Sequence, residues 1–275
     1  MSQRSFKDRC VVITGAAGGL GQALVQAFLQ AGAKVVALDR DAQALDALQH
    51  ATFTNTPNHT PSLLTAVCDV TQLPSCEAAM AQAMARFDGI DVLINNAGIA
   101  HRSAFAETQL DVLRRVMEVN FFGAVHCTHA AIASLRQRKG IVITISSVAG
   151  FAPLVGRTGY AASKHALHGF MDSLRTEVEH EGVDVLLVCP SFIATGIDSA
   201  ALGANGKALG AGRKTAGGET QASEVAAAIL QAARQRKRLL LFSATSKFSW
   251  WLSRLWPTRY AAVMKRRLFA EIFPK

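Results

Sequence analysis

Short apolar runs alternate with longer amphipathic stretches over the first two thirds of the chain. The runs are continuous and rich in β-branched residues or leucine, which is typical of parallel strands covered on both faces. They predict strands at 10–14, 34–38, 63–67, 92–94, 141–145, 183–188 and 239–242. Helical periodicity predicts helices at 20–30, 42–50, 75–86, 108–136, 160–181 and 223–234. This alternation predicts an α/β fold with a right-handed, doubly wound parallel sheet.

Two segments depart from this pattern and suggest how the chain is divided. Residues 203–218 are rich in glycine and lack hydrophobic periodicity, which predicts either a lid or a disordered loop. After residue 243 the composition becomes basic and aromatic, and all three tryptophans lie there. We therefore expect a single catalytic domain over 1–243, of a size that 275 residues allow, and a helical extension over 244–275.

The positive charge of the chain belongs to its C-terminal end. Residues 234–275 contain eleven Lys or Arg residues and one acid, although the net charge of the whole chain is only +9. Apolar residues recur there with helical spacing at Phe248, Trp251, Leu252 and Leu255, and after Pro257 at Tyr260, Val263, Met264 and Leu268. Thr258 is expected to cap the second of these helices.

Two interpretations of this tail stay open from sequence. Its helices could pack over a substrate pocket or on a partner subunit with the charges solvated, or they could lie on an anionic membrane surface. Nucleic acid is not expected as a partner.

The location predicted for the chain is cytoplasmic, with peripheral membrane contact as the open alternative. Residues 1–9 are polar, and no apolar run reaches the roughly 18–20 residues needed to cross a bilayer. The five cysteines lack CxxC spacing, which argues against a zinc site or a disulfide framework and favours buried, reduced thiols. No metal site is expected.

A glycine-rich turn follows the first predicted strand and leads into a helix. It reads Thr-Gly-Ala-Ala-Gly-Gly-Leu-Gly over 14–21, and the candidate binding residues are Gly15, Gly18, Gly19, Leu20 and Gly21. Glycines permit a tight turn and a close approach to pyrophosphate, which then meets free N–H groups at the helix N-terminus. The position between a strand and a helix therefore favours a Rossmann-type dinucleotide site over an ordinary turn.

The end of the second strand bears on which dinucleotide would bind. Asp39 lies 18 residues beyond Gly21, where a carboxylate can accept hydrogen bonds from ribose hydroxyls and would repel a 2′-phosphate. Arg40 could instead pair with that phosphate. We expect NAD, with NADP as the alternative.

Three polar residues have a spacing that suggests proton chemistry. Tyr160 and Lys164 are four residues apart in a helical segment and so share one face. A nearby ammonium, like the positive nicotinamide ring, would lower the tyrosine pKa from about 10, so that the phenol could act as a general acid or base. Ser147 follows the predicted 141–145 strand, where its hydroxyl could hold the substrate oxygen.

Taken together, these motifs resemble those of the classical short-chain dehydrogenases/reductases. The turn at 14–21, Asn-Asn-Ala-Gly at 95–98, Asn120, Ser147, and Tyr-Ala-Ala-Ser-Lys at 160–164 agree in order and spacing over roughly residues 8–242. The resemblance implies hydride transfer between a nicotinamide and an alcohol or carbonyl carbon. It also implies that Asn120 holds a water linking Lys164 to solvent.

The resemblance assigns further residues to the cofactor. Asn95, Asn96, Ala97 and Gly98 would shape the adenosine side, and Asp69 and Val70 would lie at the adenine. The nicotinamide end would be contacted by Pro190, Ile193 and Thr195, and by Tyr160 and Lys164, of which Lys164 would bind ribose. Ser191 stands where the family carries glycine, and its side chain could narrow the substrate side of the pocket or restrict the backbone geometry. The family also implies a homodimer or homotetramer formed through the helices predicted at 108–136 and 160–181.

The segments expected to face the substrate are 148–159, 191–197 and 203–218. Their apolar members are Phe151, Leu154, Val155, Phe192 and Ile197, which suggests a lipophilic alcohol or carbonyl compound, although Arg157 and Arg213 could reach inward. The alternative functions are a nucleotide-binding regulatory protein and a membrane-surface binding protein. A regulatory protein would be expected to have lost Ser147, Tyr160 or Lys164.

Overall fold

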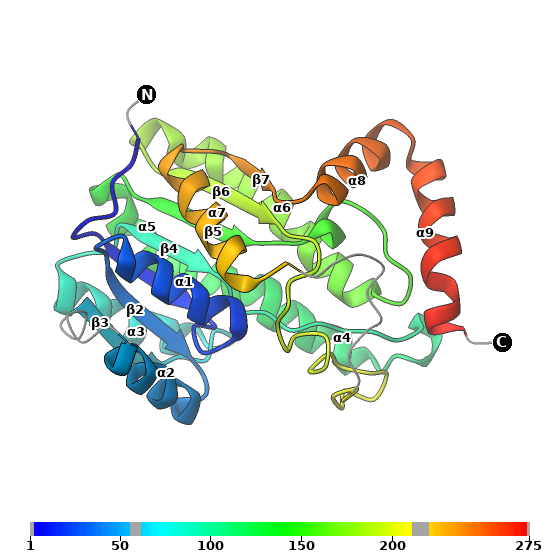
Figure 1. The fold of residues 1–275 in the computed structure, drawn as a ribbon, viewed down its shortest axis with the longest axis horizontal. Coiled ribbons are helices and arrows are strands. Elements are labelled where there is room, and N and C mark those ends of the chain that lie inside the picture. The colour runs from blue at the N-terminus through cyan, green and yellow to red at the C-terminus, as the bar shows by residue number, and fades with distance from the viewer. Residues whose placement is uncertain (1–2, 56–61, 211–219, 274–275) are drawn as a thin grey trace.

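The computed structural model describes residues 3–55, 62–210 and 220–273, which form one seven-stranded sheet (Figure 1). The strands are β1 (Cys10–Thr14), β2 (Lys34–Asp39), β3 (Leu63–Val67), β4 (Val92–Asn95), β5 (Ile141–Ile145), β6 (Asp184–Cys189) and β7 (Leu239–Leu241). Their order is β3-β2-β1-β4-β5-β6-β7, and every neighbouring pair is parallel. The predicted doubly wound sheet is confirmed. Its order reverses between β1 and β4, where such sheets form a binding crevice.

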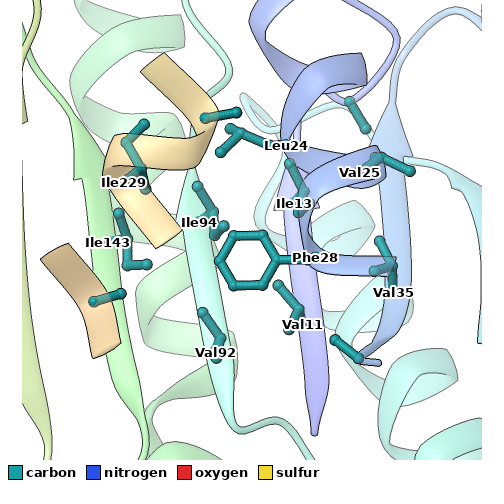
Figure 2. Packing of buried hydrophobic residues seen from close by; sticks show 14 of the residues in the cluster. Val11, Ile13, Leu24, Val25, Phe28, Val35, Val92, Ile94, Ile143 and Ile229 are labelled. Atoms are coloured by element: carbon teal, nitrogen blue, oxygen red, sulfur yellow. The ribbon is translucent and has the colours of Figure 1, made fainter. Parts of the chain in front are cut away.

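Helices cover both faces of the sheet. One face carries α1 (Gly19–Gln30), α2 (Ala42–Asn55) and α7 (Ala222–Arg234); the other carries α3 (Leu73–Phe87), α5 (Gly123–Arg138) and α6 (Thr158–Val178). Successive strand residues point to opposite faces, so Val11 and Ile13 belong to the first layer and Val12 to the second. In the first layer the fully buried ring of Phe28 lies among β-branched side chains of β1 and β4 (Figure 2).

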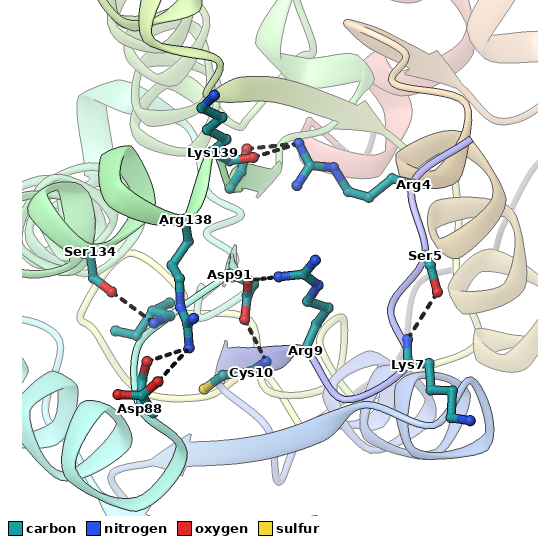
Figure 3. Close-up of polar contacts among 12 residues, drawn as sticks. Arg4, Ser5, Lys7, Arg9, Cys10, Asp88, Asp91, Ser134, Arg138 and Lys139 are labelled. Atoms are coloured by element: carbon teal, nitrogen blue, oxygen red, sulfur yellow. Dashed lines mark hydrogen bonds and ion pairs between the residues drawn. The ribbon is translucent and has the colours of Figure 1, made fainter. Parts of the chain in front are cut away.

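Polar contacts hold the amino ends of the strands (Figure 3). The buried carboxylate of Asp91 accepts hydrogen bonds from Arg9 Nη1 at 2.9 Å and from the Cys10 amide at 3.0 Å. Arg4 pairs with Asp184 at 2.8 Å, which ties the N-terminal segment to β6. These charges lie at the amino ends of the strands and leave the carboxyl ends to the crevice.

The predicted helix over 108–136 is interrupted. It consists of α4 (Leu110–Met117), a π-helical turn over Glu118–Phe122, and α5. The buried Asn120 lies in the π turn, and its side chain bonds the backbone N–H and C=O of Ile99 at 2.8 and 3.0 Å. Hydrophobic spacing gave no sign of the turn, because the contact that accompanies it comes from a distant loop.

The tail forms two helices after β7, α8 (Ala244–Leu255) and α9 (Pro257–Ile272). The expected cap at Thr258 is wrong. Pro257 is the first residue of α9, where its missing N–H costs nothing. None of the described helices is both long enough and apolar enough to span a bilayer. Part of the glycine-rich 203–218 segment, including Arg213, lies outside the described residues.

Candidate active site

A cavity of about 460 Å³ opens at the carboxyl ends of the strands. All but one of the cofactor residues predicted from sequence line it: Gly15, Gly18, Gly19, Leu20, Gly21, Asp39, Arg40, Asp69, Val70, Asn96, Ala97, Gly98, Tyr160, Lys164, Pro190, Ile193 and Thr195. Ser147 lines it too. Asn95 does not contribute, because its side chain is buried and bonds Thr128 and Thr144.

The glycine-rich turn is packed too closely for side chains. Gly15 has φ +62°, a conformation that favours glycine. A Cβ added to Gly21 would lie 2.1 Å from the Gly15 carbonyl oxygen, so the turn and α1 touch through backbone. Gly18 caps α1 without a side-chain hydrogen bond, which leaves the N–H groups of the first turn free for an anion. These features fit a dinucleotide pyrophosphate.

The acidic residue after β2 points back at this turn. Asp39 Oδ2 accepts a hydrogen bond from the Ala17 amide at 3.1 Å, and Oδ1 accepts one from the Asp41 amide at 3.2 Å. Arg40 lines the same end of the cavity but is exposed to solvent. Backbone donors therefore fix the Asp39 carboxylate at the cavity wall, whereas the Arg40 side chain is exposed to solvent.

Ser147, Tyr160 and Lys164 converge at the other end of the cavity. Ser147 follows β5, and its hydroxyl accepts a hydrogen bond from the Ala149 amide at 3.2 Å. Tyr160 and Lys164 lie one turn apart in α6, and Lys164 Nζ is 5.7 Å from the centroid of the tyrosine ring. That ammonium group donates a hydrogen bond to the Ile145 carbonyl at 2.8 Å. The structure thus brings the three predicted catalytic side chains together.

The pKa of Tyr160 shifts in the direction opposite to the one expected from sequence. Burial raises the pKa of Tyr160, while a hydrogen bond with Ser147 and the charge of Arg157 act in the opposite direction. Burial also lowers the pKa of Lys164 to about 8. The expected lowering of the tyrosine pKa is therefore wrong for the protein without its cofactor, because desolvation disfavours the phenolate.

Asn120 lies close to this group but outside the cavity lining. A Cβ added to Gly98 would be 3.2 Å from Asn120 Oδ1 and 3.7 Å from Lys164 Nζ. The Asn120 amide group also donates to Ser163 Oγ at 3.0 Å. Its side chain thus ties the 98–99 backbone to α6 beside Lys164, and the water-holding role implied by the family stays a prediction.

The substrate end of the cavity is less apolar than the sequence indicated. Leu154, Phe192 and Ile197 line it as expected, and so does Arg157, but the structure adds Asp198 and His101. The expected lining by Phe151 and Val155 is wrong. Neither borders the cavity, and the Phe151 ring packs instead against Trp250 of α8, with centroids 4.9 Å apart.

Sequence reasoning missed two histidines near the site, one buried and one half-buried. His101 borders the cavity, with Nε2 2.8 Å from Ser103 Oγ, and burial lowers its pKa. His168 lies one turn beyond Lys164 in α6, with Nε2 2.9 Å from Ser146 Oγ, and burial lowers its pKa to about 4. The spacing of His168 from Tyr160 and Lys164, four residues at each step, was the available signal.

The fold and the cavity together define an α/β protein of the dinucleotide-binding class, with a Ser-Tyr-Lys group at one end of the site. The family model described as short chain dehydrogenase matches residues 9–204. The chain therefore belongs to the short-chain dehydrogenase/reductase family and is an oxidoreductase by class.

Relatives of the chain carry the same assignment. A dehydrogenase/reductase SDR family protein 7-like from Anopheles gambiae is 36% identical, over 96% of this chain and 84% of the relative. Dehydrogenase/reductase SDR family member 7B from Mus musculus is 34% identical, over 98% and 84%. The chain also resembles a Streptomyces avermitilis short-chain dehydrogenase (28% identity, TM-score 0.78, 95% and 97% covered). A Burkholderia phymatum short-chain dehydrogenase/reductase in complex with NAD shares the fold (22% identity, TM-score 0.80, 91% and 94% covered).

Proposed function

We propose that the protein interconverts a lipophilic secondary alcohol and a ketone, or an alcohol and an aldehyde, using a nicotinamide dinucleotide. The observation that carries this proposal is the convergence of Ser147, Tyr160 and Lys164 in the cavity that also contains the glycine-rich turn. Leu154, Phe192 and Ile197 supply apolar contacts for a lipophilic substrate.

The residues of the chain have separable roles in this reaction. The bound cofactor supplies or accepts the hydride. The Ser147 hydroxyl orients the substrate oxygen, and Tyr160 Oη exchanges a proton with it. The raised pKa keeps the phenol protonated in the free protein, which is the form that donates to a carbonyl oxygen. Lys164 places its charge under the ring and, with a pKa of about 8, can itself exchange protons near neutral pH.

NAD is the proposed cofactor. Asp39 is held at the adenosine end by the Ala17 amide, and a carboxylate there favours ribose hydroxyls over a 2′-phosphate. The same cavity end includes the exposed Arg40, so NADP is the alternative that a cofactor comparison would reveal.

A matched pair of tyrosine variants tests the mechanism, because the chain contains only two tyrosines. Tyr160→Phe is expected to lower kcat by roughly 10²–10⁴ in an assay of nicotinamide absorbance with secondary alcohols and ketones of increasing size. Tyr260→Phe, in α9, is expected to leave kcat within about twofold. NADH binding followed by fluorescence should weaken by no more than a few-fold in either variant. Equal turnover by Tyr160→Phe and the native protein would exclude Tyr160 as the acid/base.

We further propose a cytoplasmic homodimer or homotetramer. The five described cysteines are free and buried, which suits a reducing compartment. A groove between α5 and α6 combines apolar residues, among them Val125, Ile132, Phe170 and Leu174, with polar and charged ones, and a second copy of the chain could fill it. Light scattering of the native protein and of Ile132→Glu measures this directly; a monomeric native protein contradicts it.

A further inference from the structure

The apolar and polar faces of α8 are reversed relative to a helix that packs on a protein core. Its buried positions are Ser246 and Ser249, whereas Phe248, Trp251 and Leu255 are 66%, 63% and 57% exposed. A surface helix normally turns its apolar stripe inward. Here three of the four residues of the stripe predicted from sequence face solvent, while Leu252 is half-buried, and Trp256 at the junction with α9 is exposed beside them.

The orientation of α8 is fixed from its polar side. Ser243 caps the helix and accepts a hydrogen bond from the Ser246 amide at 3.0 Å. Trp250 packs on Phe151 with a ring separation of 4.9 Å, and the Arg254 guanidinium lies 3.5 Å from the Trp250 centroid. Phe151 follows the short turn that begins after Ser147. The body of the protein therefore holds α8 in a position that leaves its apolar stripe uncovered.

Exposed basic side chains accompany this stripe. Lys247 and Arg254 lie in α8, and Arg259, Lys265, Arg266 and Arg267 lie in α9; all six are exposed, and none forms a salt bridge within the described residues. Residues 244–275 contain seven Lys or Arg residues against the single acid Glu271. A partner that matches both features must offer an apolar layer beneath a negatively charged surface.

We propose that the exposed face of α8, with the basic residues of α8 and α9, docks on the surface of an anionic lipid bilayer. Trp251 and Trp256 would lie at the headgroup level, where tryptophan is favoured, while Phe248 and Leu255 enter the acyl boundary. Anionic lipids attract the surrounding Lys and Arg side chains. α8 and α9 occupy one end of the molecule, away from α2 and α3 (Figure 1).

This docking places the bilayer beside the substrate end of the cavity. Ile272 of α9 lies against Gly156, because a Cβ added to Gly156 would be 2.3 Å from the Ile272 side chain. Arg157, which follows Gly156 in the chain, lines the cavity. The loop between Ser147 and Tyr160 is thus covered by the same tail that contacts lipid. Docking of the tail would therefore bring the substrate end of the cavity close to a bilayer in which a lipophilic alcohol or ketone dissolves. This consequence rests on the proposed function, whereas the docking itself does not.

Vesicle co-sedimentation of the full chain tests the docking. The native protein is expected to sediment with phosphatidylcholine vesicles that contain 30% phosphatidylserine, to bind pure phosphatidylcholine at least about tenfold less, and to be released by high salt. Phe248→Ser/Trp251→Ser should weaken binding to the anionic vesicles at least about tenfold. The matched control is Phe105→Ser/Leu110→Ser, whose side chains are 60% and 59% exposed elsewhere on the surface, and it should bind like the native protein.

The results separate lipid docking from other uses of the face. A blue shift of tryptophan fluorescence on adding anionic vesicles, reduced in Trp251→Ser, supports insertion of the stripe. Equal sedimentation of the native protein and Phe248→Ser/Trp251→Ser overturns the proposal, as does concentration-dependent self-association of the native protein that those substitutions abolish. Because binding is measured without turnover, failure here leaves the proposed oxidoreductase chemistry standing.

Discussion

Replacing Lys164 with methionine is expected to stabilise the free protein at pH 7, although it removes a catalytic side chain. Lys164 is 5% exposed, and burial lowers its pKa from 10.5 to about 8. That difference corresponds to roughly 3 kcal/mol of unfavourable folding free energy, because one pKa unit is about 1.4 kcal/mol. Methionine removes the buried charge at similar volume but leaves the Ile145 carbonyl without its 2.8 Å hydrogen bond, at a cost of about 1–2 kcal/mol.

The sign of the pH dependence follows from these two values. Below about pH 8 lysine is charged in both states, and the full penalty acts on the folded form. As pH rises from about 8 to 10.5 the folded state loses its proton first, so the native protein gains stability with pH. The advantage of Lys164→Met is thus about 1–2 kcal/mol at pH 7 and should fall by roughly 2–3 kcal/mol by pH 10.

Urea unfolding of both proteins between pH 7 and pH 10, without cofactor, measures this difference directly. Lys7→Met serves as the control, because Lys7 is exposed and its removal should produce no comparable pH dependence. A stability difference between Lys164→Met and the native protein that stays constant from pH 7 to pH 10 would refute the reasoning. It would mean that Lys164 is solvated in the folded state.

Two further predictions concern the glycine-rich turn and the choice of cofactor. Gly21→Ala should lower the free energy of unfolding by about 1–3 kcal/mol and abolish NADH binding, because its Cβ would lie 2.1 Å from the Gly15 carbonyl oxygen. Gly169→Ala is the control, since no atom lies within 4 Å of the added Cβ. It should raise the free energy of unfolding by roughly 0.5–1 kcal/mol in the same denaturation assay. Equal effects of the two changes would contradict the packing argument. Asp39→Ser should raise the ratio of kcat/KM for NADP over NAD by about tenfold or more, whereas Asp41→Ser, on an exposed residue that bonds the Ala44 amide, should change it less than twofold. An unchanged ratio in Asp39→Ser would remove Asp39 as the selectivity determinant.

The sequence determined the sheet and most of the site, since both depend on local patterns. Continuous apolar runs fixed the strands to within about one residue, because a parallel strand buried on two faces tolerates few polar residues. The turn at 14–21 and the four-residue spacing of Tyr160 and Lys164 predicted positions that the structure brings into one cavity. Such features are visible in sequence because their geometry is set by nearest neighbours along the chain.

Tertiary structure alone decided the features that depend on distant contacts. The π turn at Asn120 is accompanied by hydrogen bonds from the Asn120 side chain to the backbone of Ile99. Phe151 does not line the cavity because its ring packs on Trp250, which is distant in the sequence. Burial, and not the neighbouring ammonium, dominates the pKa of Tyr160. The tail shows the same limit. Periodicity predicted an apolar stripe on α8, but only the tertiary structure, which packs Trp250 on Phe151 and buries Ser246 and Ser249, turned most of that stripe toward solvent. A helical stripe specifies which residues share a face, and the surrounding structure determines where that face points.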